Sequence, residues 1–145
     1  MLLLPIEIPS LKIGIKSTIQ KRITGKDTAK YYGSGALDNL LPIPVLTAVM
    51  IEAAVALVDP MLPDGIITAG KYTQVDHQHP TVEGMTLTVT AELIEIHGNV
   101  LRFAMNAYDE IGQVATGIHD RVIINKDGFF RTVENRVNPL KTLVD

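Results

Sequence analysis

The chain has 145 residues, a formal net charge of −3 at pH 7, 46% hydrophobic residues and 20% charged residues. This size is typical of one domain with a real hydrophobic core, and the composition argues against disorder. The acidic balance and an aromatic content of only 5% argue against a nucleic-acid partner, which requires basic surface and stacking rings. The sequence contains no cysteine, which excludes disulfides, thiolate metal sites and thiol nucleophiles.

The beginning of the chain does not resemble a targeting segment. Residues 1–5 are apolar but lack a basic region, and Glu7 follows almost at once, so no signal peptide is expected. The longest apolar stretch, residues 45–58, is shorter than a membrane span. We therefore expect a cytoplasmic protein without a membrane partner. No repeat or linker interrupts the sequence, which predicts one domain over 1–145, with an N-terminal extension at 1–10 and a polar C-terminal tail at 126–145.

The first half of the chain predicts one strand and two helices. Apolar and polar residues alternate over 11–20, which is the period of a half-buried strand. Residues 26–32 are compatible with one short helix, which the Gly-Ser-Gly sequence at 33–35 ends. Residues 45–58 follow two prolines and are apolar on every side, as in a helix that other elements enclose.

Four strand-like segments follow this helix, at about 66–79, 85–96, 100–108 and 113–125. Short turns separate them, which predicts antiparallel neighbours. A change of phase at Leu93 predicts a bulge in the second of them. An α+β arrangement, in which a five-stranded antiparallel sheet wraps one long apolar helix, satisfies the burial of every segment. This is the hotdog fold.

Alternation also predicts which side chains face the core. In the third of these strands they are Leu101, Phe103, Met105 and Ala107. In the last strand one side carries Val114, Thr116, Ile118, Val122 and Ile124.

Two groups of polar residues are candidates for chemistry. Glu52 is the only charged residue in the apolar helix, and it can meet a partner at a subunit interface, act in catalysis, or face solvent. Residues 76–80 form the densest polar cluster, in which His77 and His79 point the same way on a strand. A histidine there can act as a general base, and two half-exposed histidines at a sheet edge are the alternative.

A metal site is a third reading of the same cluster. The spacing of His77, His79 and Glu83 resembles the first metal motif of the cupins, in which two histidines and a glutamate hold a divalent ion. A well-placed third histidine is missing from the later strands, and cupins have no long buried helix. We therefore expect no metal site.

A further candidate cluster lies on the last strand. His119 and Arg121 share one side, and Arg121 suits bidentate binding of phosphate or carboxylate, although a surface ion pair is the commoner explanation. The loop before the long helix offers side chains that can line a pocket, namely Tyr31, Tyr32, Asp38 and Asn39.

Several short pieces of the sequence occur in a characteristic order and spacing. They include Gly33-Ser34-Gly35, Met50-Ile51-Glu52-Ala53-Ala54, Gly70 seven residues before His77, and Gly117-Ile118-His119-Asp120-Arg121. Residues 11–130 thereby resemble the fluoroacetyl-CoA thioesterase-like branch of the hotdog superfamily. The resemblance implies a homodimer with acyl-CoA sites at the subunit interface and no cofactor beyond the CoA thioester itself.

The resemblance also implies roles for individual residues. His77 takes the position of the catalytic histidine, and Gly70 that of the glycine whose backbone amide contacts the thioester carbonyl. The family's threonine and glutamate positions fall on Ile43 and Ile51, neither of which can act as nucleophile or base.

Two residues near these positions are possible substitutes. Glu52 lies about 100° around the helix from Ile51, and Thr47 lies one turn after Ile43. The catalytic candidates are therefore His77, Glu52 and Thr47. The substrate-binding candidates are Gly70, Ile43, Ile51, Asn39 and Arg121. Two main functions remain open: a slow acyl-CoA thioesterase acting on a small acyl group, and a non-catalytic domain that binds acyl-CoA or another small ligand. A metal-dependent enzyme centred on His77, His79 and Glu83 is the third and least favoured alternative.

Overall fold

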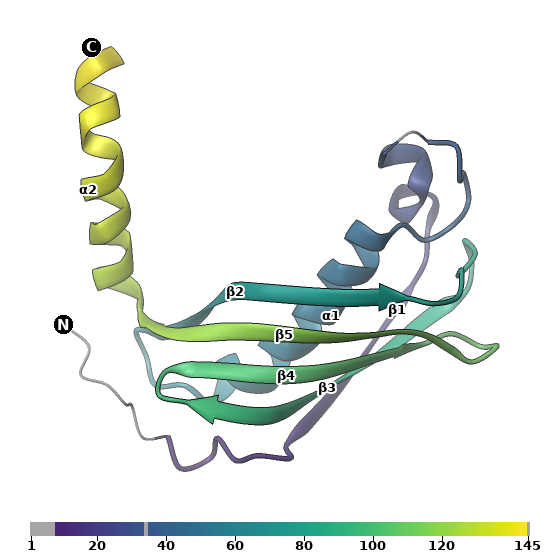
Figure 1. Ribbon diagram of the computed structural model, residues 1–145, viewed down its shortest axis with the longest axis horizontal. Helices are drawn as coiled ribbons and strands as arrows, with labels where there is room; N and C mark the ends of the chain where they lie inside the picture. Colours follow the sequence, from purple (N-terminus) through teal and green to yellow (C-terminus); the bar gives the residue numbers. More distant parts are fainter. Residues whose placement is uncertain (1–7, 34, 145) are drawn as a thin grey trace.

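The computed structural model describes residues 8–33 and 35–144 and has the predicted α+β arrangement (Figure 1). Residues 1–7 of the predicted N-terminal extension lie outside this description. In chain order the elements are β1 (Lys16–Arg22), the single 3₁₀ turns η1 (Gly25–Asp27) and η2 (Ala29–Tyr31), α1 (Ile43–Val58), η3 (Asp59–Met61), β2 (Ile66–His77), β3 (Thr86–His97), β4 (Val100–Tyr108), β5 (Gln113–Asn125) and α2 (Lys126–Val144).

The five strands form one antiparallel sheet in the order β1-β3-β4-β5-β2, and α1 lies against one of its faces (Figure 1). The predicted inward side of β4 is confirmed, because Leu101, Phe103, Met105 and Ala107 are all buried. The predicted bulge in β3 is also confirmed, between Leu93 and Glu95. In this arrangement β1 and β2 are the two edge strands of the sheet, so each has one side without a neighbouring strand in the described chain.

Three predictions about local structure are wrong. The first strand begins at Lys16 rather than at residue 11, and residues 26–32 form single turns instead of a short helix. In β5 the predicted side is out of phase, since the inward side chains are those of His119, Arg121 and Ile123. The cause is a register shift at the start of β5, where Val114 and Ala115 are both buried.

The sheet covers only one side of α1 in a single chain. Eight residues of the helix are buried, yet Ile43 is 47% exposed, and Thr47, Ile51 and Val55 continue from it as a half-buried stripe. The predicted sheet wraps α1, and this one side of the helix stays uncovered by the described residues of a single chain. By length and composition Ile43–Met61 is apolar enough to cross a membrane, and 44% of that window is buried inside the structure.

The C-terminal segment has the expected polar composition and is helical. It forms α2, a 19-residue helix that begins directly after Asn125 at the end of β5. Because Asn125 pairs with Ile66, α2 starts beside the beginning of the edge strand β2. Figure 1 shows α2 projecting past β2, away from the rest of the sheet.

Candidate active site

A bulge in β2 decides which of its side chains face α1. Gly70 pairs with Arg121 and Tyr72 pairs with Asp120, so Lys71 is the extra residue. The bulge reverses the alternation, and therefore Gly70 and His77 share the inner face although His77 is seven positions after Gly70. Without the bulge one of them would face outward.

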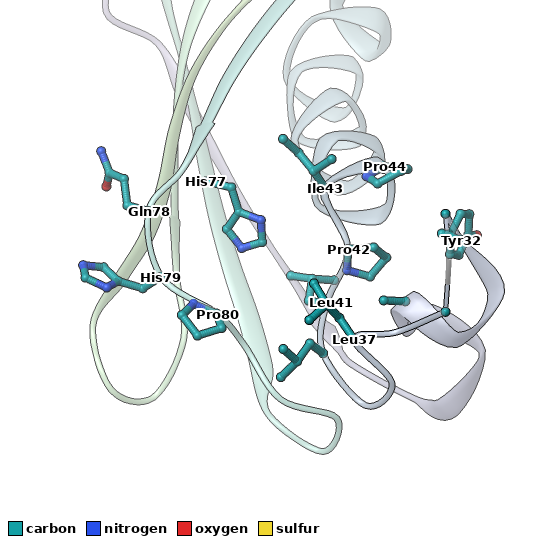
Figure 2. A pocket seen from close by; sticks show the side chains of 14 residues that line it. Tyr32, Leu37, Leu41, Pro42, Ile43, Pro44, His77, Gln78, His79 and Pro80 are labelled. Carbon is teal, nitrogen blue, oxygen red and sulfur yellow. The ribbon is translucent and has the colours of Figure 1, made fainter.

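His77 faces a cavity of about 570 Å³ between the end of β2 and the beginning of α1. Figure 2 shows its imidazole in the space between β2 and the beginning of α1, where Ile43 lies. The walls are largely apolar, and they come from the loop before α1, the first turn of α1 and the segment after β2. The lining residues are Ala29, Tyr32, Gly33, Gly35, Leu37, Leu40, Leu41, Pro42, Ile43, Pro44, His77, Gln78, His79 and Pro80.

The electrostatics of His77 suit a general base. Its Nε2 atom is buried and has no hydrogen-bond partner among the described residues. Burial lowers the pKa of His77 below its usual value, and a hydrogen bond with the backbone of His79 opposes this shift. Since Nε2 has no partner, we infer that this bond involves Nδ1, so that a neutral imidazole would keep an unpaired Nε2 lone pair at the wall of the cavity.

His79 is not a second histidine of the same kind. The strand ends at His77, and the backbone N–H groups of Gln78 and His79 both donate to the carbonyl of Val114, at 2.8 and 3.1 Å. This local irregularity turns His79 away from His77 (Figure 2), so the prediction that the two point the same way is wrong. The carboxylate of Glu83 lies instead beside Gly25, and the described residues hold no group of three potential metal ligands.

Arg121 belongs to a buried network rather than to the surface ion pair that seemed the commoner explanation. It is 7% exposed, and its Nε and Nη2 donate to Oγ1 and the carbonyl oxygen of Thr68, at 2.7 and 2.9 Å. The Thr68 hydroxyl donates in turn to Asp59 at the end of α1. The ion pair of this strand joins Asp120 to Arg102 in bidentate fashion, at 2.8 and 2.9 Å.

Both ring nitrogens of His119 make hydrogen bonds within this network. Its Nδ1 lies 2.9 Å from the carbonyl oxygen of Tyr72 and 3.0 Å from Oγ1 of Thr73, and Nε2 lies 3.1 Å from Nη1 of Arg121. Because the carbonyl can only accept and the guanidinium can only donate, Nδ1 carries the proton and Nε2 accepts. His119 therefore has no free lone pair, whereas His77 has one.

His119 should make the folding free energy depend on pH. Burial, and next to it the charge of Arg121, lower its pKa in the folded state. The unfolded chain takes up this proton near the ordinary value of about 6.5, so the folded state is expected to lose stability as the pH falls below about 6.5.

Urea unfolding at pH 7.5, 6.5 and 5.5 measures this loss. His119→Gln is expected to reduce the slope of stability against pH, whatever it does to stability at pH 7.5. An unchanged slope would show that the shifted histidine is not His119.

The other predicted site residues are only partly brought together. Ile43 lines the cavity, and Thr47 and Ile51 follow it at one-turn intervals on the open face of α1. Glu52 is exposed beside that face and does not line the cavity. Asn39 also lies outside the lining; it adopts a left-handed φ of 65°, and its carbonyl accepts from the backbone N–H of Glu83 at 2.8 Å.

Of the loop residues expected to line a pocket, Tyr32 does so. The apolar wall formed by Leu37, Leu41 and Pro80 was not predicted from the sequence. The prolines near the start of the long helix and after the two histidines were the sequence features that could have indicated this wall.

Comparison with known proteins shows to which family the chain belongs. The family described as fluoroacetyl-CoA-specific thioesterase matches residues 23–127. The chain belongs to this family. The curated fluoroacetyl-CoA thioesterase of Streptantibioticus cattleyicolor is 31% identical over 91 residues, a match that spans 63% of this chain and 66% of that relative, slightly less than two thirds.

Solved structures place the same chain among hotdog proteins. The hot-dog-like protein from Thermanaerovibrio acidaminovorans superposes with a TM-score of 0.81 at 28% identity, covering 86% of this chain and 91% of that one. A variant of the fluoroacetyl-CoA thioesterase FlK in complex with acetyl-CoA gives 0.80 at 25% identity, covering 87% and 98%. The family match ends at residue 127, close to the beginning of α2.

Proposed function

We propose that this member of the fluoroacetyl-CoA thioesterase family is a cytoplasmic enzyme that hydrolyses a small acyl-CoA thioester with His77 as general base. The observation that carries the proposal is the buried, unpartnered Nε2 of His77 at the wall of a largely apolar cavity of about 570 Å³. A neutral imidazole there can hold a water molecule beside an acyl group. The family and the acetyl-CoA complex of a structural relative support this substrate class.

The reaction requires only water and this one base. Nε2 of His77 takes a proton from water while the oxygen adds to the thioester carbonyl carbon, giving a tetrahedral oxyanion. The C–S bond then breaks, and the imidazolium returns the proton to the CoA thiolate. No cofactor enters these steps. Ile43 and Ile51 cannot donate or accept a proton, so we expect slow turnover from general-base catalysis by His77, worth about 10²–10⁴-fold in rate.

The site is complete only if two chains form it. Gly70 and His77 share the inner face of β2, but they are about 20 Å apart along the strand. We propose a homodimer in which β2 pairs antiparallel with β2 of a second copy, so that Gly70 of one chain lies beside His77 of the other. Support comes from the long edge strand, 12 residues with one unpaired side, and from the half-exposed apolar stripe on α1.

Gly70 and Arg121 have defined tasks in this shared site. A Cβ at Gly70 would lie 3.4 Å from both Nη1 of Arg121 and Cε1 of His119, so glycine permits close packing there. We propose that the thioester oxygen approaches the backbone at Gly70. The positive charge of Arg121 lies close to Gly70, held by Thr68 and His119, with the carboxylate of Asp59 on the far side of Thr68. This charge would stabilise the negative oxygen of the tetrahedral intermediate.

A non-catalytic acyl-CoA binding domain is the second candidate. Ile43 favours it, because an apolar side chain faces His77 where the family resemblance leads us to expect a hydroxyl group. A binder of this kind would retain the cavity and its affinity for acyl groups without turning the thioester over.

Release of free thiol from a panel of short acyl-CoA thioesters distinguishes the two candidates. We expect turnover for at least one ester, together with a rise in melting temperature with slowly hydrolysed esters. A rise in melting temperature without turnover would favour the binding domain. In that case Ile51→Glu tests whether a carboxylate on the open face of α1 restores hydrolysis, with Ile51→Gln as its uncharged control.

A further inference from the structure

Helix α2 carries an apolar stripe that the fold does not cover. The stripe consists of Phe129, Phe130, Val133, Val137 and Leu140, and all but the half-buried Val137 count as exposed. From Phe130 onward the spacing is three, four and three residues, which keeps these side chains on one side of a helix. The neighbour that α2 contacts most is β5, the strand from which it starts. Neither the family's shared domain nor the proposed active site explains the stripe.

A second uncovered apolar group lies at the opposite end of the sheet, on the turn between β4 and β5. Ile111 at this turn is 82% exposed, and the neighbouring Tyr108 is also exposed. The turn is well held, because Asp109 accepts hydrogen bonds from Oγ1 of Thr81 at 2.8 Å and from the backbone N–H groups of Ile111 and Gly112, at 2.8 and 3.2 Å. Ile111 is therefore presented to solvent on a fixed support.

The charges of the two elements are opposite. Residues 108–113 contain Asp109 and Glu110 and no basic residue. Both carboxylates accept hydrogen bonds from neutral donors, Thr81 and backbone N–H groups for Asp109 and the backbone N–H of Thr86 for Glu110. Helix α2 carries more basic than acidic residues. The four basic residues are Lys126, Arg131, Arg136 and Lys141, and the two acidic residues are Asp127 and Glu134.

Antiparallel pairing of β2 in two copies would bring these elements together. In one chain α2 starts at the Ile66 end of β2, and the β4–β5 turn lies beyond the His77 end (Figure 1). The pairing that sets Gly70 beside His77 of the second copy reverses one chain relative to the other. It therefore sets α2 of the first chain beside the β4–β5 turn of the second.

The length of α2 matches this arrangement. In the paired sheet, β5 of the first copy is followed by its own β2, and then by β2, β5 and β4 of the second copy. The β4–β5 turn of the second copy is therefore three to four strand spacings from β5 of the first copy, where α2 starts. That is about 14–19 Å at about 4.8 Å per strand. A helix that rises about 1.5 Å per residue covers this distance in roughly 10–13 residues, which ends near Val137 in the stripe.

We propose that α2 of each copy packs its apolar stripe against the β4–β5 turn of the second copy. Val137 and Leu140 contact Ile111 there, and Arg131 and Arg136 lie near Asp109 and Glu110. The inference rests on the proposed homodimer with its shared site. The added helix then holds the two chains in the register that brings His77 and Gly70 of different chains together.

A sequence without cysteine permits a direct test by cross-linking. The double variant Val137→Cys/Ile111→Cys is expected to form a disulfide between chains on mild oxidation, seen as a dimer on a non-reducing gel at low protein concentration. The matched control is Asn135→Cys/Ile111→Cys. Position 135 lies about 200° around the helix from position 137, so at least several-fold less cross-linking is expected.

Sedimentation supplies the second measurement, on the otherwise unchanged full chain. Val137→Glu is expected to raise the dimer dissociation constant at least tenfold, and Asn135→Glu to leave it unchanged. A dimeric protein that neither cross-links through position 137 nor is weakened by Val137→Glu would overturn the docking of α2 but leave the shared site standing. A monomeric protein would overturn both. Efficient cross-linking without any thiol release would support the docking and count against the thioesterase.

Discussion

Replacement of His77 by alanine is expected to lower kcat for thiol release by about 10²–10⁴-fold. His77 offers an Nε2 atom without a hydrogen-bond partner at the cavity wall, whereas both ring nitrogens of the buried His119 are occupied. His77 lies at the end of β2, and its Nε2 contributes no hydrogen bond to the described structure, so the variant should fold. Steady-state release of CoA thiol, measured with a colorimetric thiol reagent, gives the comparison.

The pH profile provides an independent check of the same role. Burial keeps the pKa of His77 below its ordinary value of about 6.5, so the wild-type rate should be level near neutral pH and fall only as the pH drops below about 6.5. His97→Ala is the control, because the side chain of His97 is 77% exposed at the end of β3 and does not line the cavity, so its loss should leave the rate nearly unchanged. Equal losses in both variants would contradict the assignment.

Truncation of Phe103 to alanine is expected to destabilise the protein by about 3–5 kcal/mol. Phe103 is fully buried in β4, and its ring stacks on that of His119 with 6.5 Å between centroids. The change removes a large apolar side chain from the core and leaves a cavity beneath the Arg121 network. Urea unfolding followed by circular dichroism measures the difference in unfolding free energy.

Ile13→Ala is the control for this measurement, since Ile13 is 58% exposed and its loss should change stability by no more than about 0.5 kcal/mol. If Phe103→Ala does not fold at all, Phe103→Leu should fold with a smaller loss. A loss for either Phe103 variant no larger than that of Ile13→Ala would show that the core is not centred on β4.

Periodicity in the sequence predicted the fold because most elements have one buried side. In β4 the inward residues alternate without interruption from Leu101 to Ala107, and in α1 the apolar run exceeds what a surface helix carries. The arrangement of the strands followed from the short turns between them.

The site was harder to predict because β-bulges determine which of its side chains face inward. Nothing in the sequence around Lys71 marks the extra residue that turns both Gly70 and His77 inward, and the similar irregularity at Val114 hid the burial of Arg121. These shifts depend on pairing with neighbouring strands, which a single strand does not reveal. The stripe of α2 was visible as the spacing of Val133, Val137 and Leu140, but the polar composition of the segment obscured it.

Complementation between two inactive variants tests most directly whether the active site joins His77 of one chain to Gly70 of another. His77→Ala and Gly70→Val would each be checked for dimer formation, then mixed in equal amounts until native mass spectrometry shows exchange of subunits. Half of the dimers then contain one chain of each variant, and in each of these dimers one of the two active sites is intact. The shared site therefore predicts recovery of about a quarter of wild-type thiol release. Mixed dimers with no more activity than the separate variants would contradict it.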